Sequence, residues 1–233
     1  MLQPTQLAKP IGLTDWAYHW LKRAILSLDL APGAQLNINT IASELNISRT
    51  PIREAFLRLE KDGLVKSIPR IGFYVTEITK RDLEELYEIR ELLESRAIED
   101  AVNNLNDQDL RKVDHLIETG FMSIEEKDVD KYLQAEIDFH NFLIEHSRNR
   151  HLISIMESLR DLTLRWRNLS LRTFRNLKLS QQEHIDIVAA MKSRDGKKAG
   201  EMMSRHIRNS QARILKLVET LSHQDGVMDG RPD

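Results

Sequence analysis

The 233-residue sequence contains no cysteine. This absence excludes disulfide bonds, metal sites built from thiolates and catalysis by a cysteine nucleophile. Any metal ion would have to bind through histidine, aspartate or glutamate side chains.

Long apolar runs are also missing from the sequence. No stretch approaches the roughly 20 residues that a membrane-spanning helix needs, and segment 1–11 lacks the apolar core of a signal peptide. Hydrophobic residues make up 41% and charged residues 30% of the chain, which is typical of a globular protein. We therefore expect a cytoplasmic protein that does not contact membranes.

A large excess of one charge is absent as well, because the formal net charge is only −2. The two parts of the chain nevertheless differ. Residues 1–76 contain nine Lys and Arg against six Asp and Glu, whereas residues 77–233 contain 25 against 30. The basic excess therefore lies in the N-terminal part.

Apolar periodicity predicts two domains, the first with three helices and a β-hairpin and the second almost entirely helical. The expected divisions are an N-terminal arm (1–13), a first domain (14–76), a linker (77–79), a second domain (80–222) and a C-terminal tail (223–233). The fold class is thus mainly α. Helices of the second domain are expected near 80–103, 107–120, 129–147, 151–170, 180–194 and 197–222.

Local signals delimit the elements of the first domain. Thr14 is expected to cap its first helix, Ser48 is expected to cap its third helix, and Gly63 is expected to end that third helix. The hairpin should then pair 64–68 with 73–76. Two helices joined by a tight turn and followed by a hairpin form a winged helix-turn-helix.

The third helix carries two arginines near its N-terminus. Arg49 and Arg53 are one turn apart and lie away from the apolar stripe of the helix. The major groove of DNA admits a helix, and the planar guanidinium group can engage guanine O6 and N7 together. We therefore expect both arginines to contact base edges. The alternative is a solvated cationic face, but the whole arrangement of elements favours double-stranded DNA as the partner.

Other polar groups surround this helix N-terminus. The hydroxyl groups of Ser48 and Thr50 are placed where phosphate oxygens would lie, because a helix N-terminus attracts anions. Arg70 and Gly72, at the tip of the expected hairpin, could approach the DNA backbone or the minor groove. These four residues complete the predicted DNA-binding set.

Three helices of the second domain each place a histidine within an apolar stripe. His140, His184 and His206 follow this pattern, and Glu136 shares the face of His140 because four helical residues amount to a rotation of only about 40°. If the faces converge, one carboxylate and three imidazoles suit a divalent Zn, Ni, Fe or Mn ion. The alternative is that each histidine is a hydrogen-bonded core residue.

The sequence also resembles a known family. The segment APGAQLNINTIASELNISRTPIREAFLRLEKDGLV, followed by PRIGFYV, resembles the N-terminal domain of the GntR family of bacterial transcription regulators over residues 14–76. The resemblance implies that Arg49, Thr50, Arg53 and the wing glycine Gly72 meet the operator.

Residues 80–222 resemble the all-helical FCD effector-binding domain of one branch of that family. Its metal-binding members carry Asp-x-x-x-His on one helix and single histidines on two later helices. The matching positions here are Glu136, His140, His184 and His206, with Glu in place of Asp.

Arg90 lies on the first helix of the second domain, beside an apolar stripe. An inward arginine would bind either an anion or Glu94, one turn further along the helix. The resemblance implies that an arginine at this place lines the pocket near the metal, where it would bind the carboxylate of a small organic acid.

The combined interpretation is a ligand-responsive transcription regulator, expected to be a repressor, that acts as a homodimer on a pseudo-palindromic operator. Two alternatives are retained: the same regulator with a pocket that binds no metal, and a metalloenzyme. The second alternative is less favoured because no independent general base is evident and a whole domain is devoted to DNA.

Overall fold

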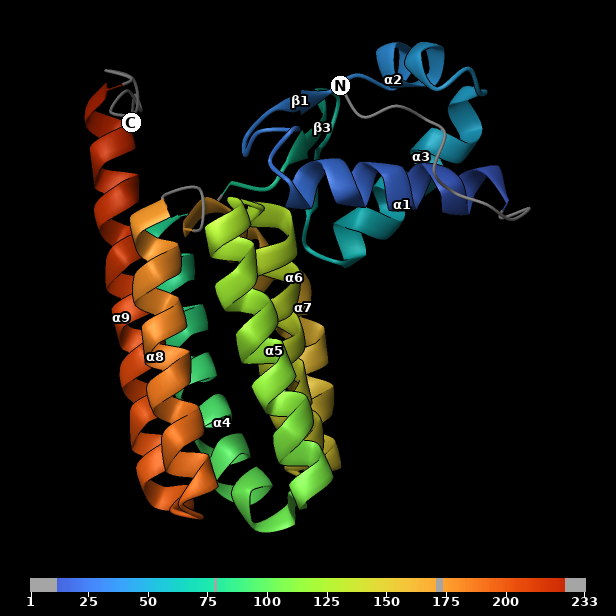
Figure 1. Cartoon of the computed structure of the whole chain (residues 1–233). Helices are drawn as coiled ribbons and strands as arrows, with labels where there is room; N and C mark the ends of the chain where they lie inside the picture. Colours follow the sequence, from blue (N-terminus) through green and yellow to red (C-terminus); the bar gives the residue numbers. More distant parts are fainter. Residues whose placement is uncertain (1–11, 78, 171–173, 225–233) are drawn as a thin grey trace. The chain divides into compact units, whose positions relative to one another are not determined.

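Figure 1 shows the computed structural model, which describes residues 12–77, 79–170 and 174–224. The chain divides into two compact units between Thr79 and Lys80. The first is a winged helix-turn-helix and the second is an all-α bundle, which confirms the predicted fold class. Most of the expected N-terminal arm and C-terminal tail lies outside the described residues. Within the described part, no helix combines the length and apolarity needed to cross a bilayer.

In residues 12–77, the first unit contains three helices and a three-stranded antiparallel sheet. Its helices are α1 (Leu13–Leu26), α2 (Ile38–Glu44) and α3 (Arg49–Lys61), and its strands are β1 (Gln35–Leu36), β2 (Val65–Ile68) and β3 (Gly72–Val75). The strand order is β1-β3-β2. The predicted hairpin is therefore confirmed, with Val65 opposite Val75 and Ile68 opposite Gly72.

The turn between α2 and α3 depends on Asn46. This residue adopts a left-handed backbone with φ of 52°, which Asn tolerates better than most residues. The amide of Ile47 donates to the carbonyl of Ala42 at 3.0 Å, and the amide of Asn46 donates to the carbonyl of Ser43 at 3.2 Å. These two bonds satisfy carbonyls at the end of α2 and redirect the chain into α3.

Gly63 ends α3 in the same way, as predicted. Its φ is 72°, and the amide of the following Leu64 donates to the carbonyl of Leu59 at 2.9 Å. A glycine adopts this conformation without the steric cost that a Cβ atom would impose. The chain then enters β2, so that this turn positions the wing next to the arginine-bearing helix.

Of the two expected helix caps, Thr14 is wrong, and Ser48 is confirmed in its position. The N-cap of α1 is Gly12, and Thr14 lies inside the helix, where its hydroxyl donates to Glu54 at 2.6 Å. Ser48 does occupy the N-cap position of α3, but its hydroxyl makes no capping hydrogen bond. Propensity identifies Thr14 as a residue that is able to cap, whereas Glu54 accepts a hydrogen bond from the same hydroxyl group.

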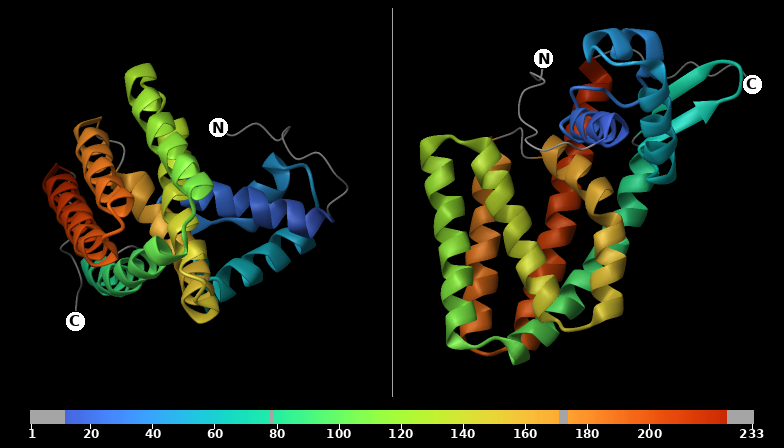
Figure 2. Two further views of the ribbon diagram at one scale, coloured as in Figure 1. Left: turned by 60° about the horizontal axis from the view of Figure 1, so that its bottom comes forward. Right: turned by 90° about the vertical axis from the view of Figure 1, so that its right-hand side faces the viewer.

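The described part of the second unit contains six long helices. They are α4 (Lys80–Asn104), α5 (Asp107–Glu126), α6 (Val129–His146), α7 (Arg150–Ser170), α8 (Phe174–Lys192) and α9 (Gly196–Gln224). Within this unit the helices run side by side, with α4 packed against α6, α7 and α9 (Figures 1 and 2). Buried apolar side chains such as Ala97, Ile144 and Met156 join α4, α6 and α7.

Two helix boundaries were predicted wrongly. The helix expected at 107–120 continues to Glu126, and the helix expected at 180–194 begins at Phe174. Gly120 does not end α5. A Cβ atom there would lie 2.6 Å from Oε1 of Gln181 on α8, so the glycine allows two helices to approach closely. A sequence pattern does not distinguish this use of glycine from a helix stop.

Candidate metal centre and nucleic-acid interface

Helix α6 presents Glu136 and His140 on its buried face. Both side chains are buried, whereas Asp138, about 200° from His140 around the helix, is exposed. This agrees with the helical phase inferred from the sequence. A carboxylate and an imidazole one turn apart can thus point at the same place inside the bundle.

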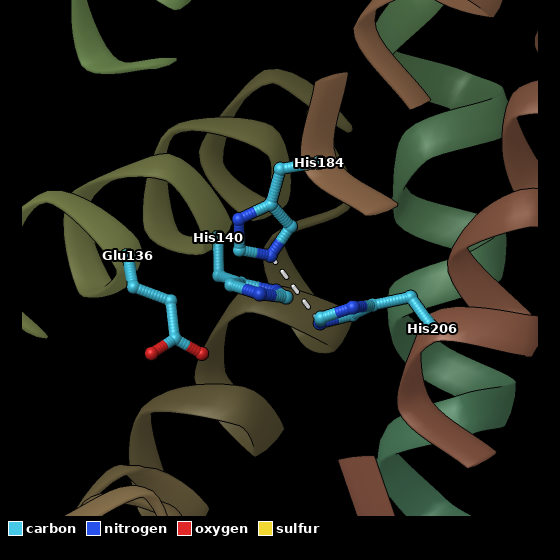
Figure 3. Close-up of side chains that lie close together, drawn as sticks. All are labelled: Glu136, His140, His184 and His206. Atoms are coloured by element: carbon cyan, nitrogen blue, oxygen red, sulfur yellow. Dashed lines mark hydrogen bonds between the residues drawn. The ribbon is translucent and has the colours of Figure 1, made fainter. Parts of the chain in front are cut away.

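Helices α8 and α9 bring two further histidines to this place. One ligand atom from each of Glu136, His140, His184 and His206 lies within 4.8 Å of the others. The three imidazole rings face one another, with the carboxylate of Glu136 beside them (Figure 3). Nε2 of His184 lies 3.3 Å from Nε2 of His206. The structure therefore brings together all four residues that the sequence selected.

Carboxylates bind two of the imidazole rings at Nδ1, the ring nitrogen that points away from the centre of the cluster. Nδ1 of His140 is hydrogen bonded to Glu94, which also accepts from Nε of Arg90 at 2.7 Å. Nδ1 of His206 is hydrogen bonded to Glu183 at 2.7 Å. With Nδ1 donating to a carboxylate, the lone pair of each ring lies on Nε2, the atom that faces the centre.

Arg213 completes the support of His206. Its two terminal nitrogens each donate to Glu183 at 2.9 Å, in a bidentate arrangement. Burial opposes ionisation of Glu183, but hydrogen bonds from His206 and Arg213 lower the pKa of this carboxyl group to about 2. The carboxylate is therefore ionised, and at neutral pH it can accept a hydrogen bond from the Nδ1–H group of His206.

The histidines of the cluster have properties of metal ligands. Burial lowers the pKa of His140 to about 3, and Arg167 acts in the same direction. Burial, together with His206, lowers the pKa of His184 well below its usual value. Both rings are therefore neutral at physiological pH, which is the state that binds metal ions.

Unsatisfied atoms provide the test of whether an ion fits. Among the described residues, Nε2 of His140 and Oε2 of Glu136 are buried and have no hydrogen-bond partner. Leaving such groups unpaired costs free energy. Two nitrogens on one zinc ion at about 2.0–2.1 Å would lie roughly 3.0–3.4 Å apart, which the 3.3 Å separation of His184 and His206 matches. The residues present therefore fit a divalent ion.

A pocket adjoins the cluster on the side of α6 and α7. His140, Thr163 and Arg167 contribute polar groups to its lining, and Ile144 and Met156 contribute apolar surface. Nε of Arg167 lies 3.5 Å from Oε1 of Glu136. Oγ1 of Thr163 is a further buried atom without a hydrogen-bond partner among the described residues. Polar groups therefore converge next to the candidate metal site.

Arg90 is fully buried, as an inward arginine should be, and it forms the salt bridge with Glu94 that the sequence offered as an alternative. Its guanidinium carbon lies 4.5 Å from the centre of the Tyr87 ring. One nitrogen, Nη1, retains no hydrogen-bond partner among the described residues. Arg90 thus supports Glu94 and, through it, His140.

The candidate DNA-reading surface lies at the N-terminus of α3. Ser48, Arg49, Thr50 and Arg53 are all exposed there, and the described residues supply no ion-pair partner for either arginine. Arg58 differs, because it pairs with Asp15 and its guanidinium carbon lies 4.1 Å from the centre of the Tyr18 ring. Arg49 and Arg53 are therefore available to contact DNA, whereas Arg58 is used in packing.

The wing tip is a tight turn that exposes a cation. The amide of Ile71 donates to the carbonyl of Ile68 at 3.1 Å, and Pro69 and Arg70 occupy the two central positions. Arg70 is exposed with φ of 65°, a conformation that is uncommon for a side chain of its size. Gly72 follows with φ of 140°, which strongly favours glycine.

Comparison with known proteins identifies the family. Residues 13–75 match the model of bacterial regulatory proteins of the gntR family, and residues 85–209 match the model of the FCD domain. The chain belongs to the GntR family. As a GntR-family protein with an FCD domain, it is a DNA-binding transcription regulator with an effector-binding domain, and it is not an enzyme.

Similar proteins are also described as transcription regulators. YdhC of Bacillus subtilis, an uncharacterized HTH-type transcriptional regulator, is 29% identical and spans 92% of this chain and 96% of its own. The HTH-type transcriptional repressor RspR of Escherichia coli is 26% identical, over 89% and 91% of the two chains. The solved structure of E. coli McbR/YncC superimposes with a TM-score of 0.73 at 26% identity, covering 88% of this chain and 98% of that one.

The sequence did not reveal the charged residues that contact the histidines and Glu136 from other helices. Glu94 was predicted only as a partner of Arg90, and no role was predicted for Arg167 or Glu183. All three were visible only as charged residues on long helices. Their contacts with the cluster cross between helices, and only Glu94, at i+4 from Arg90, had a local signal.

Proposed function

We propose that this GntR-family regulator is a repressor whose FCD domain binds a divalent metal ion together with a small organic acid. The observation that carries the proposal is the convergence of four buried residues whose ligand atoms lie within 4.8 Å of one another. Among the described residues, Nε2 of His140 and Oε2 of Glu136 have no hydrogen-bond partner. Glu136, His140, His184 and His206 would hold the ion. Once bound, the ion would supply Lewis-acid coordination sites for an oxygen-bearing ligand.

The residues around the ligands would keep them oriented. Glu94 and Glu183 hold the Nδ1 atoms of His140 and His206, and Arg90 and Arg213 in turn hold those two carboxylates. Such outer contacts restrict ring rotation and favour the neutral tautomer that binds through Nε2. The site would therefore be organised before an ion arrives.

The adjoining pocket supports a carboxylic acid as the effector. Arg167 lines the pocket, where its Nε lies 3.5 Å from Oε1 of Glu136. Arg90 is paired with Glu94, which also lines the pocket, and its Nη1 has no hydrogen-bond partner among the described residues. Guanidinium groups bind carboxylates with paired hydrogen bonds. The apolar lining from Ile144, Ile153 and Met156 would accommodate a short carbon skeleton.

The winged unit would place α3 in the major groove of the operator. Arg49 and Arg53 would contact base edges, Ser48 and Thr50 would contact phosphates, and Arg70 with Gly72 would bring the wing to the backbone or minor groove. One short helix contacts few base pairs, so two copies on a two-fold axis would read a pseudo-palindrome. The homodimer is therefore part of the proposal.

We propose that the regulator acts as a repressor because one similar protein, RspR, is named a transcriptional repressor. Binding of the acid would have to favour one placement of the winged units over another, because a ligand shifts an equilibrium only through different affinities for its states. An operator-bound fraction that falls as the acid is added would support a repressor that is released by its effector.

Metal binding is tested by equilibrium dialysis of full-length protein that has been stripped and then exposed to Zn²⁺, Ni²⁺, Fe²⁺ or Mn²⁺. We expect one ion per chain, and an affinity at least about 100-fold lower in His206→Ala because one of four ligands is lost. His151→Ala, at an exposed histidine of α7, is the matched control and should bind as the wild type does. Equal binding by wild type and His206→Ala would refute the site.

The specific observation in favour of a metal-free pocket is the direct contact between His184 and His206, since imidazoles can hydrogen bond to each other. In that case the wild-type protein would bind no stoichiometric ion, and a panel of small mono- and dicarboxylates would still change its melting temperature. Loss of that response in Arg167→Gln, with retention in Arg150→Gln, would place the acid beside α7 with or without an ion.

A further inference from the structure

Two arginine–carboxylate pairs at the candidate metal centre are joined by direct hydrogen bonds. Nε of Arg90 donates to Glu94 at 2.7 Å. Both terminal nitrogens of Arg213 donate to Glu183 at 2.9 Å. Each of these carboxylates also contacts Nδ1 of a histidine, on the side of the ring that faces away from the centre. These two pairs therefore lie outside the set of candidate ligands and can stay intact when an ion binds.

A third pair, between Arg167 on α7 and Glu136 on α6, is looser. Nε of Arg167 lies 3.5 Å from Oε1 of Glu136, and the two side chains are only 8% and 6% exposed. Neither this Nε nor Oε2 of Glu136 has a hydrogen-bond partner among the described residues. Opposite charges at this distance inside a protein attract each other. The two groups can nevertheless separate without breaking a hydrogen bond between these atoms.

The two members of this third pair face different ligands. Glu136 is one of the four candidate metal ligands, whereas Arg167 lines the pocket proposed for the acid. An ion would need the carboxylate of Glu136, and an acid would need the guanidinium group of Arg167. Binding of either ligand would therefore draw one member out of the pair and release the member that the other ligand uses.

The positive charge of Arg167 also acts on the histidines of the cluster. Burial is the main cause that lowers the pKa of His140, and Arg167 is the next cause. The pKa of His184 is lowered by burial first, then by the other two histidines, and then by Arg167. A charge that disfavours a proton on these rings also disfavours a divalent cation between them. Arg167 should therefore weaken metal binding until an anion neutralises it.

We propose that Arg167 couples the metal site to the acid site. It pairs with Glu136 while both sites are empty, and it pairs with the carboxylate of the acid once Glu136 binds the ion. Each ligand then raises the affinity of the protein for the other, because coupling between two binding sites is reciprocal. The inference rests on the proposed metal and acid sites and assigns the residue that joins them.

Calorimetric titration of Zn²⁺ into stripped full-length protein tests the metal side. The titration is made in sodium chloride and in sodium acetate of equal ionic strength, with acetate as the probe because it supplies a single carboxylate. Acetate should raise the zinc affinity of the wild type about tenfold. Arg167→Gln should bind zinc about tenfold more tightly than the wild type in chloride, and acetate should add nothing further.

Two variants show whether the charge of Arg167 is responsible. Arg167→Lys keeps the positive charge, so its zinc affinity in chloride should stay within about threefold of the wild type. Arg150→Gln removes a charge at an exposed position of the same helix and is the matched control, with unchanged affinity and an unchanged response to acetate. Circular dichroism would show that each variant keeps its helix content.

Glu136→Gln tests the acid side without any ion. The substitution removes the carboxylate that pairs with Arg167, so the metal-free variant should bind acetate at least about fivefold more tightly than the metal-free wild type. Titration with acetate, followed by NMR, gives both dissociation constants. Asp138→Asn makes the same change of charge at an exposed position of α6 and should bind acetate as the wild type does.

The outcomes separate this coupling from the proposed function. If the wild type binds zinc and Arg167→Gln binds it no more tightly in chloride, the coupling is refuted and the metal site stands. An acetate affinity that is unchanged in metal-free Glu136→Gln would also overturn the coupling. If the wild type binds no zinc in either salt, the metal site and the coupling are both refuted.

Discussion

At the scale of single residues, the carboxylates bonded to Nδ1 of His140 and His206 distinguish an organised metal site from a group of buried imidazoles. Glu183 accepts from His206 and from both terminal nitrogens of Arg213, which holds the ring of His206 in one orientation. A glutamine at this position would keep the shape but lose the charge. The Nδ1–H group of His206 would then face a weaker acceptor.

We therefore expect Glu183→Gln to lower metal affinity by about 10- to 100-fold without loss of the fold. Glu201→Gln, at an exposed position of α9, is the matched control. Competition of both variants against a fluorescent zinc chelator gives the affinities. Glu183 has no part in orienting the ligands if the two variants bind the ion equally well.

A second prediction at this scale concerns the arginines of α3. Arg53→Ala should cost about 1–3 kcal/mol of operator binding and relax the preference for one base position, because an exposed cation is removed from the reading helix. Arg58→Ala should instead lower the free energy of unfolding by about 1 kcal/mol through its contacts with Asp15 and Tyr18, and leave base preference unchanged. Binding to a library of operator variants discriminates the two; equal effects on every DNA sequence would contradict the assignment.

At the scale of elements, the wing tip combines backbone strain with an exposed charge. Arg70 holds φ at 65°, where a Cβ atom costs about 1–2 kcal/mol. Arg70→Gly removes both the strain and the cation. We expect the free energy of unfolding to stay the same or rise by up to about 1 kcal/mol, while DNA binding weakens on all sequences.

The measurement for this variant is the salt dependence of DNA affinity. Loss of one phosphate contact should reduce the slope of log affinity against log salt by about one. Arg70→Lys keeps the charge and is the matched control for the slope. An unchanged slope in Arg70→Gly would show that the wing tip stays away from the phosphates.

At the scale of the whole molecule, the two compact units allow ligand effects to be located. An ion bound only to native protein at 100 times its dissociation constant stabilises by about 2.7 kcal/mol. All four candidate ligands lie in the helical unit. Metal addition should therefore raise the unfolding temperature of that unit and leave the winged unit unchanged.

Scanning calorimetry of the full-length chain with and without metal measures this difference. His206→Ala, which retains the winged unit intact, should show no metal-dependent shift in either transition. A shift of the winged unit in the His206→Ala variant would place the bound ion elsewhere.

How much of the molecule was predictable depended on whether the signal was local. The periodicity of apolar residues identified most helix positions and the hairpin, and Gly63 was recognised as the end of a helix. The strand β1, Gln35–Leu36, was missed because two residues are too short for a periodic signal. The helix expected near 107–120 was predicted too short, because it continues past Gly120 to Glu126, and the close approach of Gln181 at Gly120 comes from another helix.

The sequence by itself determined which side chains share a helix face, because a rotation of about 100° per residue follows from backbone geometry alone. It thereby selected Glu136 with His140 rather than Asp138, and the exposed arginines of α3. Only the tertiary structure decided that His140, His184 and His206 meet at one point, and that Glu94, Glu183 and Arg167 stand around them. Those distances depend on how separate helices pack, and packing is a collective property of side chains that are far apart in the chain.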